Sequence, residues 1–165
     1  MIFGMTYLTF VHVLLSLIGI FAGLVVLFGL LASKQFKGWT AVFIWTTVAT
    51  SVTGFLFPFH RFLPSHAVGI VSLVVLVFAI YALYGQHLAG AWRRIYAITA
   101  MIGLYLNVFV LIAQLFAKVP ALKALAPTQT ETPFKEAQLA ALVAFVVLTI
   151  LAAIKFHPEP IASAT

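Results

Sequence analysis

The chain alternates long apolar stretches with a few short polar segments. Uncharged stretches cover residues 1–33, 38–60, 62–92, 95–117 and 137–154. Each approaches or exceeds the roughly 18 to 20 residues that a helix needs to cross about 30 Å of hydrocarbon. The pattern predicts five transmembrane helices, at about 5–32, 39–59, 65–88, 92–117 and 136–155. We therefore expect an all-α polytopic membrane protein with one integral membrane domain over residues 1–165.

The polar segments between the predicted spans set the arrangement of the helices. Three are short, namely SKQFKG, HRFLP and the AGA around Gly90. Short connections make consecutive helices antiparallel neighbours, which predicts an antiparallel four-helix bundle plus a fifth helix. The connection over 118–135 is longer. Its apolar residues at 119, 122 and 125 predict a short helix on the membrane interface, ended by Pro127.

Composition supports the membrane class and excludes several others. The chain is 64% hydrophobic and 7% charged, with a mean hydropathy of +1.19, whereas soluble domains carry about 25% charged residues. The net charge of +6 comes from basic residues scattered at the ends of spans, which is typical of membrane anchoring. We expect the lipid bilayer as a partner and no nucleic acid. Because the chain has no cysteine, disulfides, thiolate metal sites and iron–sulfur clusters are excluded.

The distribution of basic residues predicts an orientation. We call the face that bears the amino terminus side A and the opposite face side B. Side A receives Arg61 and three lysines of the long loop, and side B receives five basic residues, mostly in short loops: Lys34, Lys37, Arg93, Arg94 and Lys155. The positive-inside rule then favours a cytoplasmic side B and carboxy terminus, and a periplasmic amino terminus.

Polar residues inside the first span share one helix face. Thr9, His12, Ser16, Gly19 and Gly23 follow a spacing of three and four residues, so this face should turn into the bundle. Gly19 and Gly23 also form a GxxxG motif, which lets two helix backbones approach closely. The motif fits packing within the chain or a seam between two copies. The hydroxyls of the second span can bond to carbonyls of their own helix.

The fourth span carries a polar stripe that contains Asn107 and Gln114 and runs from mid-membrane to side A. Side-chain amides in hydrocarbon need hydrogen-bond partners. The stripe therefore predicts either contacts with another helix or a ligand carbonyl.

Histidines gather on side A. His12 should lie about 10 Å below this face, and His60, Arg61 and His66 lie in or beside the turn between spans two and three. For a b-type haem, His12 and His66 are the candidate iron ligands and Arg61 a partner for the propionates, although His66 should lie nearer the surface than His12. A quinone needs only one or two hydrogen-bond donors, which His, Arg or Gln could supply. His87 and His157 fall on side B.

The strings LYLNVFVLIAQ and LAPTQTETPF carry a resemblance to a family of small multi-pass bacterial proteins without an assigned function. The resemblance covers most of the chain and implies a bacterial inner-membrane protein, with no reaction or cofactor attached. A looser similarity to small b-type cytochromes rests on a four-helix core with histidines at the ends of spans.

Three functions remain open. The first is electron transfer with haem b or a quinone on side A, using His12, His66, His60, Arg61, Asn107 and Gln114. The second is a non-catalytic accessory or assembly subunit of a larger membrane complex, or of a homo-oligomer. The third, transport of protons or a small solute, is weaker because no Asp, Glu, Lys or Arg lies in the middle of a span. No hydrolase, kinase or metalloprotease motif is present.

Overall fold

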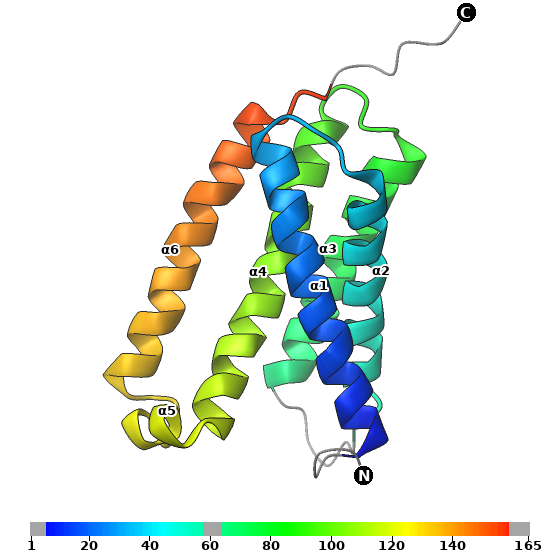
Figure 1. Cartoon of the computed structure of the whole chain (residues 1–165). Coiled ribbons are helices and arrows are strands. Elements are labelled where there is room, and N and C mark those ends of the chain that lie inside the picture. Colours follow the sequence, from blue (N-terminus) through cyan, green and yellow to red (C-terminus); the bar gives the residue numbers. More distant parts are fainter. Residues whose placement is uncertain (1–5, 58–63, 159–165) are drawn as a thin grey trace, which may run out of the picture.

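The computed structural model describes residues 6–57 and 64–158, and this part of the chain contains helices and no strand. The elements are α1 (Tyr7–Leu31), α2 (Lys37–Gly54), α3 (Pro64–Ile80), the π-helix η1 (Tyr81–Gly85), α4 (Trp92–Lys118), α5 (Pro120–Leu125) and α6 (Thr132–Lys155). The chain reverses direction from each long helix to the next (Figure 1). The start of α1, the end of α2 and the end of α4 therefore lie together on side A. The all-helical prediction is confirmed for the described residues.

Four helices of the described part are long and apolar enough to cross a membrane. These are Tyr7–Leu31, Pro64–Gly85, Trp92–Lys118 and Thr132–Lys155. They correspond to the first, third, fourth and fifth predicted spans. The second predicted span, α2, is not among them. Its 18 residues include five threonines, a serine, two glycines and a lysine, which lower its mean hydropathy.

Several element boundaries differ from the predicted ones. The helix α2 ends at Gly54 rather than near 59, because the backbone turns at Phe55 and Leu56. Helix α6 begins at Thr132 rather than at 136, with a proline in its first turn, where the missing N–H costs nothing. The short helix predicted after 118 is present as α5 and ends before Pro127.

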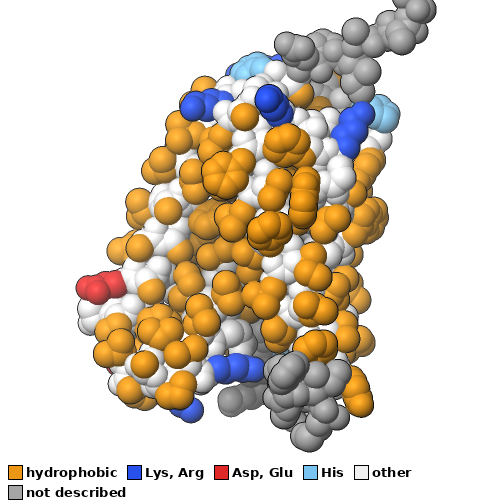
Figure 2. All heavy atoms as spheres, in the orientation of Figure 1, with side chains coloured by type: hydrophobic (Ala, Val, Ile, Leu, Met, Phe, Trp, Pro, Cys, Tyr) orange, Lys and Arg blue, Asp and Glu red, His pale blue; other side chains and the backbone are white. Residues whose placement is uncertain are grey.

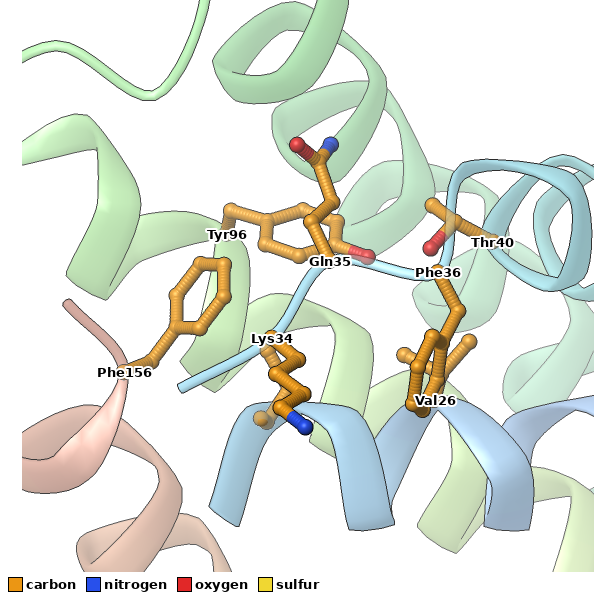
Figure 3. Close-up of a pocket in the computed structure, with 8 residues that line it drawn as sticks. Val26, Lys34, Gln35, Phe36, Thr40, Tyr96 and Phe156 are labelled. Atoms are coloured by element: carbon orange, nitrogen blue, oxygen red, sulfur yellow. The ribbon is translucent and has the colours of Figure 1, made fainter. Parts of the chain in front are cut away.

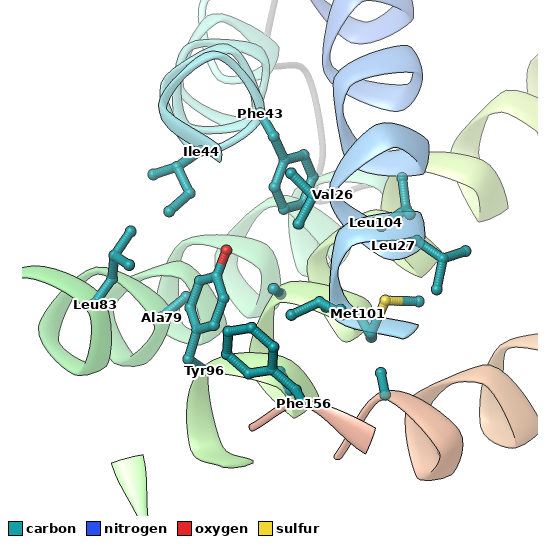
Figure 4. Packing of buried hydrophobic residues seen from close by; sticks show 14 of the residues in the cluster. Val26, Leu27, Phe43, Ile44, Ala79, Leu83, Tyr96, Met101, Leu104 and Phe156 are labelled. Carbon is teal, nitrogen blue, oxygen red and sulfur yellow. The ribbon is translucent and has the colours of Figure 1, made fainter. Parts of the chain in front are cut away.

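The tightly packed core lies in the half of the molecule toward side B. Helix α1 packs against α2 and α4, and α3 packs against the same two helices. The buried residues of α1 begin at Gly19, and those of α4 end at Leu104 except for Phe116. Figure 4 shows this core, in which Phe43, Tyr96, Met101 and others interdigitate. The half toward side A has fewer buried residues and more polar ones.

Close approach of α1 in the core depends on Gly23. A Cβ atom there would lie 2.5 Å from Cδ1 of Leu104 and 3.0 Å from the ring of Phe43. Gly19 approaches Thr46 and Thr47 in the same way. Both glycines of the GxxxG motif therefore pack against helices of their own chain, as one of the two predicted readings required.

Helix α6 lies at the edge of the molecule, alongside α4 and in contact with α1 (Figure 1). Ala152 is the one residue of α6 that is buried. The rest of its surface is mostly apolar, and Figure 2 shows hydrophobic side chains over the sides of the molecule, with Lys, Arg and His toward its ends. Such a surface fits lipid contact, since apolar groups gain nothing from facing water.

Candidate functional site on side A

The best-defined polar contact on side A joins α1 to α2. Nδ1 of His12 lies 2.9 Å from the hydroxyl oxygen of Thr53. The edge-on ring of Phe57 packs against the imidazole, with 5.2 Å between the ring centroids and 88° between the planes. Gly54 also faces the ring, because a Cβ atom there would lie 3.6 Å from Cε1 of His12. The end of α2 therefore fixes the orientation of this imidazole.

The hydrogen bond also selects the tautomer of His12. The Thr53 hydroxyl lies 2.8 Å from the carbonyl oxygen of Ala49 and 3.1 Å from that of Thr50, and it donates its single proton to these carbonyls. Its oxygen must then accept the proton of Nδ1–H. Nε2 is left with a lone pair, and no described residue gives it a hydrogen bond. This is the arrangement in which a protein holds an imidazole for a metal ion or a proton donor.

His66 lies in the first turn of α3 and is buried, with 5% of its surface exposed. Its ring centroid lies 5.9 Å from that of Phe55. His12 and His66 thus both lie beside the segment 53–57, at a more similar depth than the sequence predicted. They contact different residues of it, since His12 contacts Thr53 and Phe57 and the ring of His66 lies beside that of Phe55.

Asn107 and Gln114, two of the other predicted site residues, are not gathered around His12. Asn107 donates from Nδ2 to the hydroxyl of Thr47 at 3.2 Å. Thr47 lies six residues before Thr53, which places it about 9 Å deeper along α2. Gln114 is exposed on the side A half of α4. His60 and Arg61 lie outside the described residues. Of the two readings for Asn107, contact with another helix is the one observed.

No group of three or more histidine, aspartate and glutamate side chains among residues 6–57 and 64–158 could hold a metal ion. Within this part of the chain, a metal at His12 and His66 would need further ligands from elsewhere, as haem provides through its porphyrin. The two-histidine iron site stays a prediction.

A series of hydroxyls on α2 extends from His12 into the molecule, and their partners on other helices could not be predicted from the sequence. Ser51 donates to the hydroxyl of Ser72 on α3 at 3.1 Å. Thr47 accepts from Asn107, and the hydroxyl of Thr50 is buried without a hydrogen-bond partner. The hydroxyls of Thr46, Ser51 and Thr53 also bond to carbonyls of α2, as predicted. Helix α2 thus presents its polar groups to α1, α3 and α4.

The loop before α6 folds back onto side A. Nε2 of Gln129, a residue with a left-handed backbone (φ 59°), donates to the carbonyl oxygen of Ala113 at 2.7 Å. Oε1 of Glu131 accepts from the hydroxyl of Thr128 at 2.8 Å, and Oε2 accepts from the amide of Thr130 at 3.0 Å. The Thr128 hydroxyl is the main cause of a lowered pKa for Glu131. The ionised carboxylate of Glu131 therefore accepts hydrogen bonds from two residues of the loop, and Gln129 ties the loop to α4.

Comparison with known proteins gives no match, whether with protein-family models, curated protein sequences or solved structures. Function has to be argued from the residues of this chain alone.

Proposed function

We propose that this protein is a bacterial inner-membrane protein that binds a quinone or a haem b beside His12 on side A and takes part in electron transfer. The observation that carries the proposal is the hydrogen bond from His12 to Thr53. It supports a neutral imidazole whose Nε2 can accept a proton or bind iron. The bound group would carry the electrons, because no side chain of this cysteine-free site does so.

The residues on side A support the quinone form better than the haem form. A haem held by two histidines needs both imidazoles on one iron, whereas His12 and His66 contact different residues of the segment 53–57. A quinone needs only one of them. In that form Nε2 of His12 would accept a hydrogen bond from a hydroquinone hydroxyl, and Thr53 would hold the imidazole in place. His66, His60, Arg61 and Gln114 remain candidates for the second oxygen of the quinone or for the haem propionates.

The proposal includes five transmembrane helices, namely the four apolar helices described above and α2. The 18 residues of α2 extend about 27 Å, close to the thickness of the hydrocarbon layer. Its low hydropathy does not argue against a span, because Thr47, Ser51 and Thr53 bond to carbonyls or to other helices instead of facing lipid. An antiparallel bundle of α1 to α4 with α6 at its edge follows from this arrangement. The positive-inside rule supports a periplasmic side A.

The visible spectrum of the protein, purified in mild detergent and measured oxidised and dithionite-reduced, tests the haem form. A Soret band that His12→Ala abolishes and His157→Ala retains supports haem at this site. His157 is a suitable control because it lies on side B, where its backbone amide donates to Ser33.

Quinone extracted from the same preparations and measured by mass spectrometry tests the other form. We expect a stoichiometric quinone in the unmodified protein and in His157→Ala, and a marked loss in His12→Ala. A colourless protein that also carries no quinone from membranes rich in it would refute both forms.

A second candidate function is that of an accessory subunit, and the outer face of α6 favours it. Large apolar side chains such as Leu139, Val143, Val146 and Ile150 are exposed along this face. A helix of a larger membrane complex, or of a second copy, could pack there as well as lipid can. Co-purification of a stoichiometric membrane partner in mild detergent, lost on replacing Val143 and Val146 by Trp, would support this function.

A further inference from the structure

A groove opens on side B, at the opposite end of the molecule from His12. It has a volume of about 260 Å³. Its lining comes from the connection before α2, the first turn of α2, η1 and the turn after η1, with the residues Gln35, Lys37, Thr40, Leu83, Tyr84, His87 and Leu88. One wall is therefore polar and basic, and the other is partly apolar.

The apolar wall has an unusual backbone. Helix α3 widens into a π-helix, in which the amide of Gln86 bonds to the carbonyl of Tyr81 at 2.9 Å. His87 and Leu88 then adopt left-handed conformations, with φ of 48° and 60°. Such a conformation is unfavourable for leucine, whose Cβ atom crowds the backbone there. It places both residues on the groove.

The electrostatics of the groove favour an anion. The carboxylates within the described residues, Glu131 and Glu136, lie at the start of α6 on side A. Neither of these two can neutralise Lys37 on side B, and Glu159, the third acidic residue of the chain, lies outside the described residues. The first turn of α2 adds to the positive potential, because its N-cap residue Phe36 provides no side-chain hydrogen bond to the free amides.

A buried hydroxyl lies next to the groove. Tyr96 is 1% exposed, and its hydroxyl interacts with that of Thr40 without reaching good hydrogen-bond geometry. Figure 3 shows this hydroxyl pointing toward Thr40 and the connection around Gln35, and both of these residues also line the groove. A ligand oxygen that reached this hydroxyl would offer it a better-aligned hydrogen bond.

We propose that this groove binds the headgroup of an anionic phospholipid. Lys37 and the first amides of α2 would contact the phosphate, the hydroxyls of Thr40 and Tyr96 would donate to its oxygens, and Leu83 and Leu88 would contact the start of the acyl chains. A lipid fits better than a soluble anion because the groove has an apolar wall and opens beside the lipid-facing surface of α3. This site is independent of the function proposed for side A.

Native mass spectrometry of the detergent-solubilised protein tests the site. The protein is titrated with phosphatidylglycerol and, separately, with zwitterionic phosphatidylcholine. We expect tighter binding of phosphatidylglycerol, weakened about fivefold by Lys37→Gln, as expected for one basic residue near an anionic lipid. Lys155→Gln is the matched control, since this lysine lies on the same side but does not line the groove. It should leave the affinity unchanged.

Tyr96→Phe tests whether the Tyr96 hydroxyl contacts the bound lipid. The variant keeps the ring packed against Phe156 and should fold. We expect a loss of phosphatidylglycerol affinity of about tenfold, because hydrogen bonds to charged groups are strong. Equal affinities for the two lipids, equal effects of Lys37→Gln and Lys155→Gln, or an unchanged affinity in Tyr96→Phe would each overturn the proposal. Complete displacement of the lipid by equimolar inorganic phosphate would show a phosphate site and overturn the lipid assignment.

Discussion

His12 on α1 donates a hydrogen bond from Nδ1 to the hydroxyl oxygen of Thr53 on α2, across 2.9 Å. This contact ties the side A end of α1 to the last turn of α2, in the half of the molecule where few residues are buried. It also determines which nitrogen of His12 is available. The same bond therefore serves both the packing of the helices and the chemistry proposed for the site.

Thr53→Val should uncouple these two helices. Valine keeps the shape of threonine but removes the acceptor for Nδ1–H, and a double-mutant cycle with His12→Ala should give a coupling of about 0.6 kcal/mol, typical of hydrogen bonds between membrane helices. The measurement is the free energy of unfolding in detergent micelles. Thr99→Val is the control, because the Thr99 hydroxyl donates only to carbonyls of its own helix, at 2.7 and 3.2 Å. A cycle with no coupling would mean that the bond does not form.

Asn107 should contribute more to stability than Gln114, although both belong to the same polar stripe. Asn107 is bonded to Thr47 on α2 and lies close to Gly19 on α1, whereas Gln114 is exposed. Asn107→Ala should cost about 1 to 2 kcal/mol, and Gln114→Ala should change stability by less than about 0.5 kcal/mol. Unfolding in detergent again measures both. Equal effects would indicate that the stripe acts through its surroundings rather than through this bond.

The contrast between Asn107 and Gln114 shows what the sequence could and could not predict. Hydrophobic periodicity located the helices because lipid and core both select apolar residues. It also identified the face of α1 that carries His12, Gly19 and Gly23. Spacing alone could not reveal which polar residue of a stripe finds a partner, since that depends on the depth and rotation of the neighbouring helix. For the same reason, Thr53 could not be recognised as the partner of His12.

The structure near side B was the hardest to foresee. Nothing in YALYGQHLAGA marks a π-helix followed by left-handed His87 and Leu88, because leucine normally avoids that conformation. Only Gly90, with a φ of 54°, follows the usual preference. The boundary of the third helix was accordingly wrong by three residues. The surrounding contacts override the local preference, and such overriding is not visible in one sequence.

A larger residue at Gly23 should destabilise the core. In Gly23→Ala the new methyl group meets Leu104 at 2.5 Å and Phe43 at 3.0 Å, and both side chains are about 1% exposed and cannot move freely. The clash should outweigh the gain in helix propensity and cost about 1 to 3 kcal/mol. Gly38→Ala is the control. A Cβ atom at Gly38 would meet nothing within 4 Å, so this change should stabilise the protein by up to about 1 kcal/mol.

Single cysteines can test the orientation of the protein and the crossing by α4, because the chain has no cysteine of its own. Ala91→Cys lies in the connection before α4 on side B, and Thr130→Cys lies in the loop before α6 on side A. If side A is periplasmic, a membrane-impermeant maleimide should label only Thr130→Cys in intact cells and both variants after lysis. Labelling of only Ala91→Cys in intact cells would reverse the orientation. Labelling of both would contradict the predicted number of crossings between these positions.

The loop that contains Glu131 should lose its structure in acid. Hydrogen bonds from Thr128 and Thr130 stabilise the ionised carboxylate, so the pKa of Glu131 in the folded protein lies below its usual value of 4.5. A group whose pKa is lowered on folding stabilises the fold above its unfolded pKa, and this contribution is lost as the pH falls through the folded value.

In a titration by carbon-detected NMR, the Glu131 carboxyl should have a midpoint below 4.5, and the Thr130 amide should shift with it. Glu131→Gln should abolish the shift of the Thr130 amide, and Glu136→Gln should preserve it. A midpoint at or above 4.5 would show that these hydrogen bonds do not form in solution.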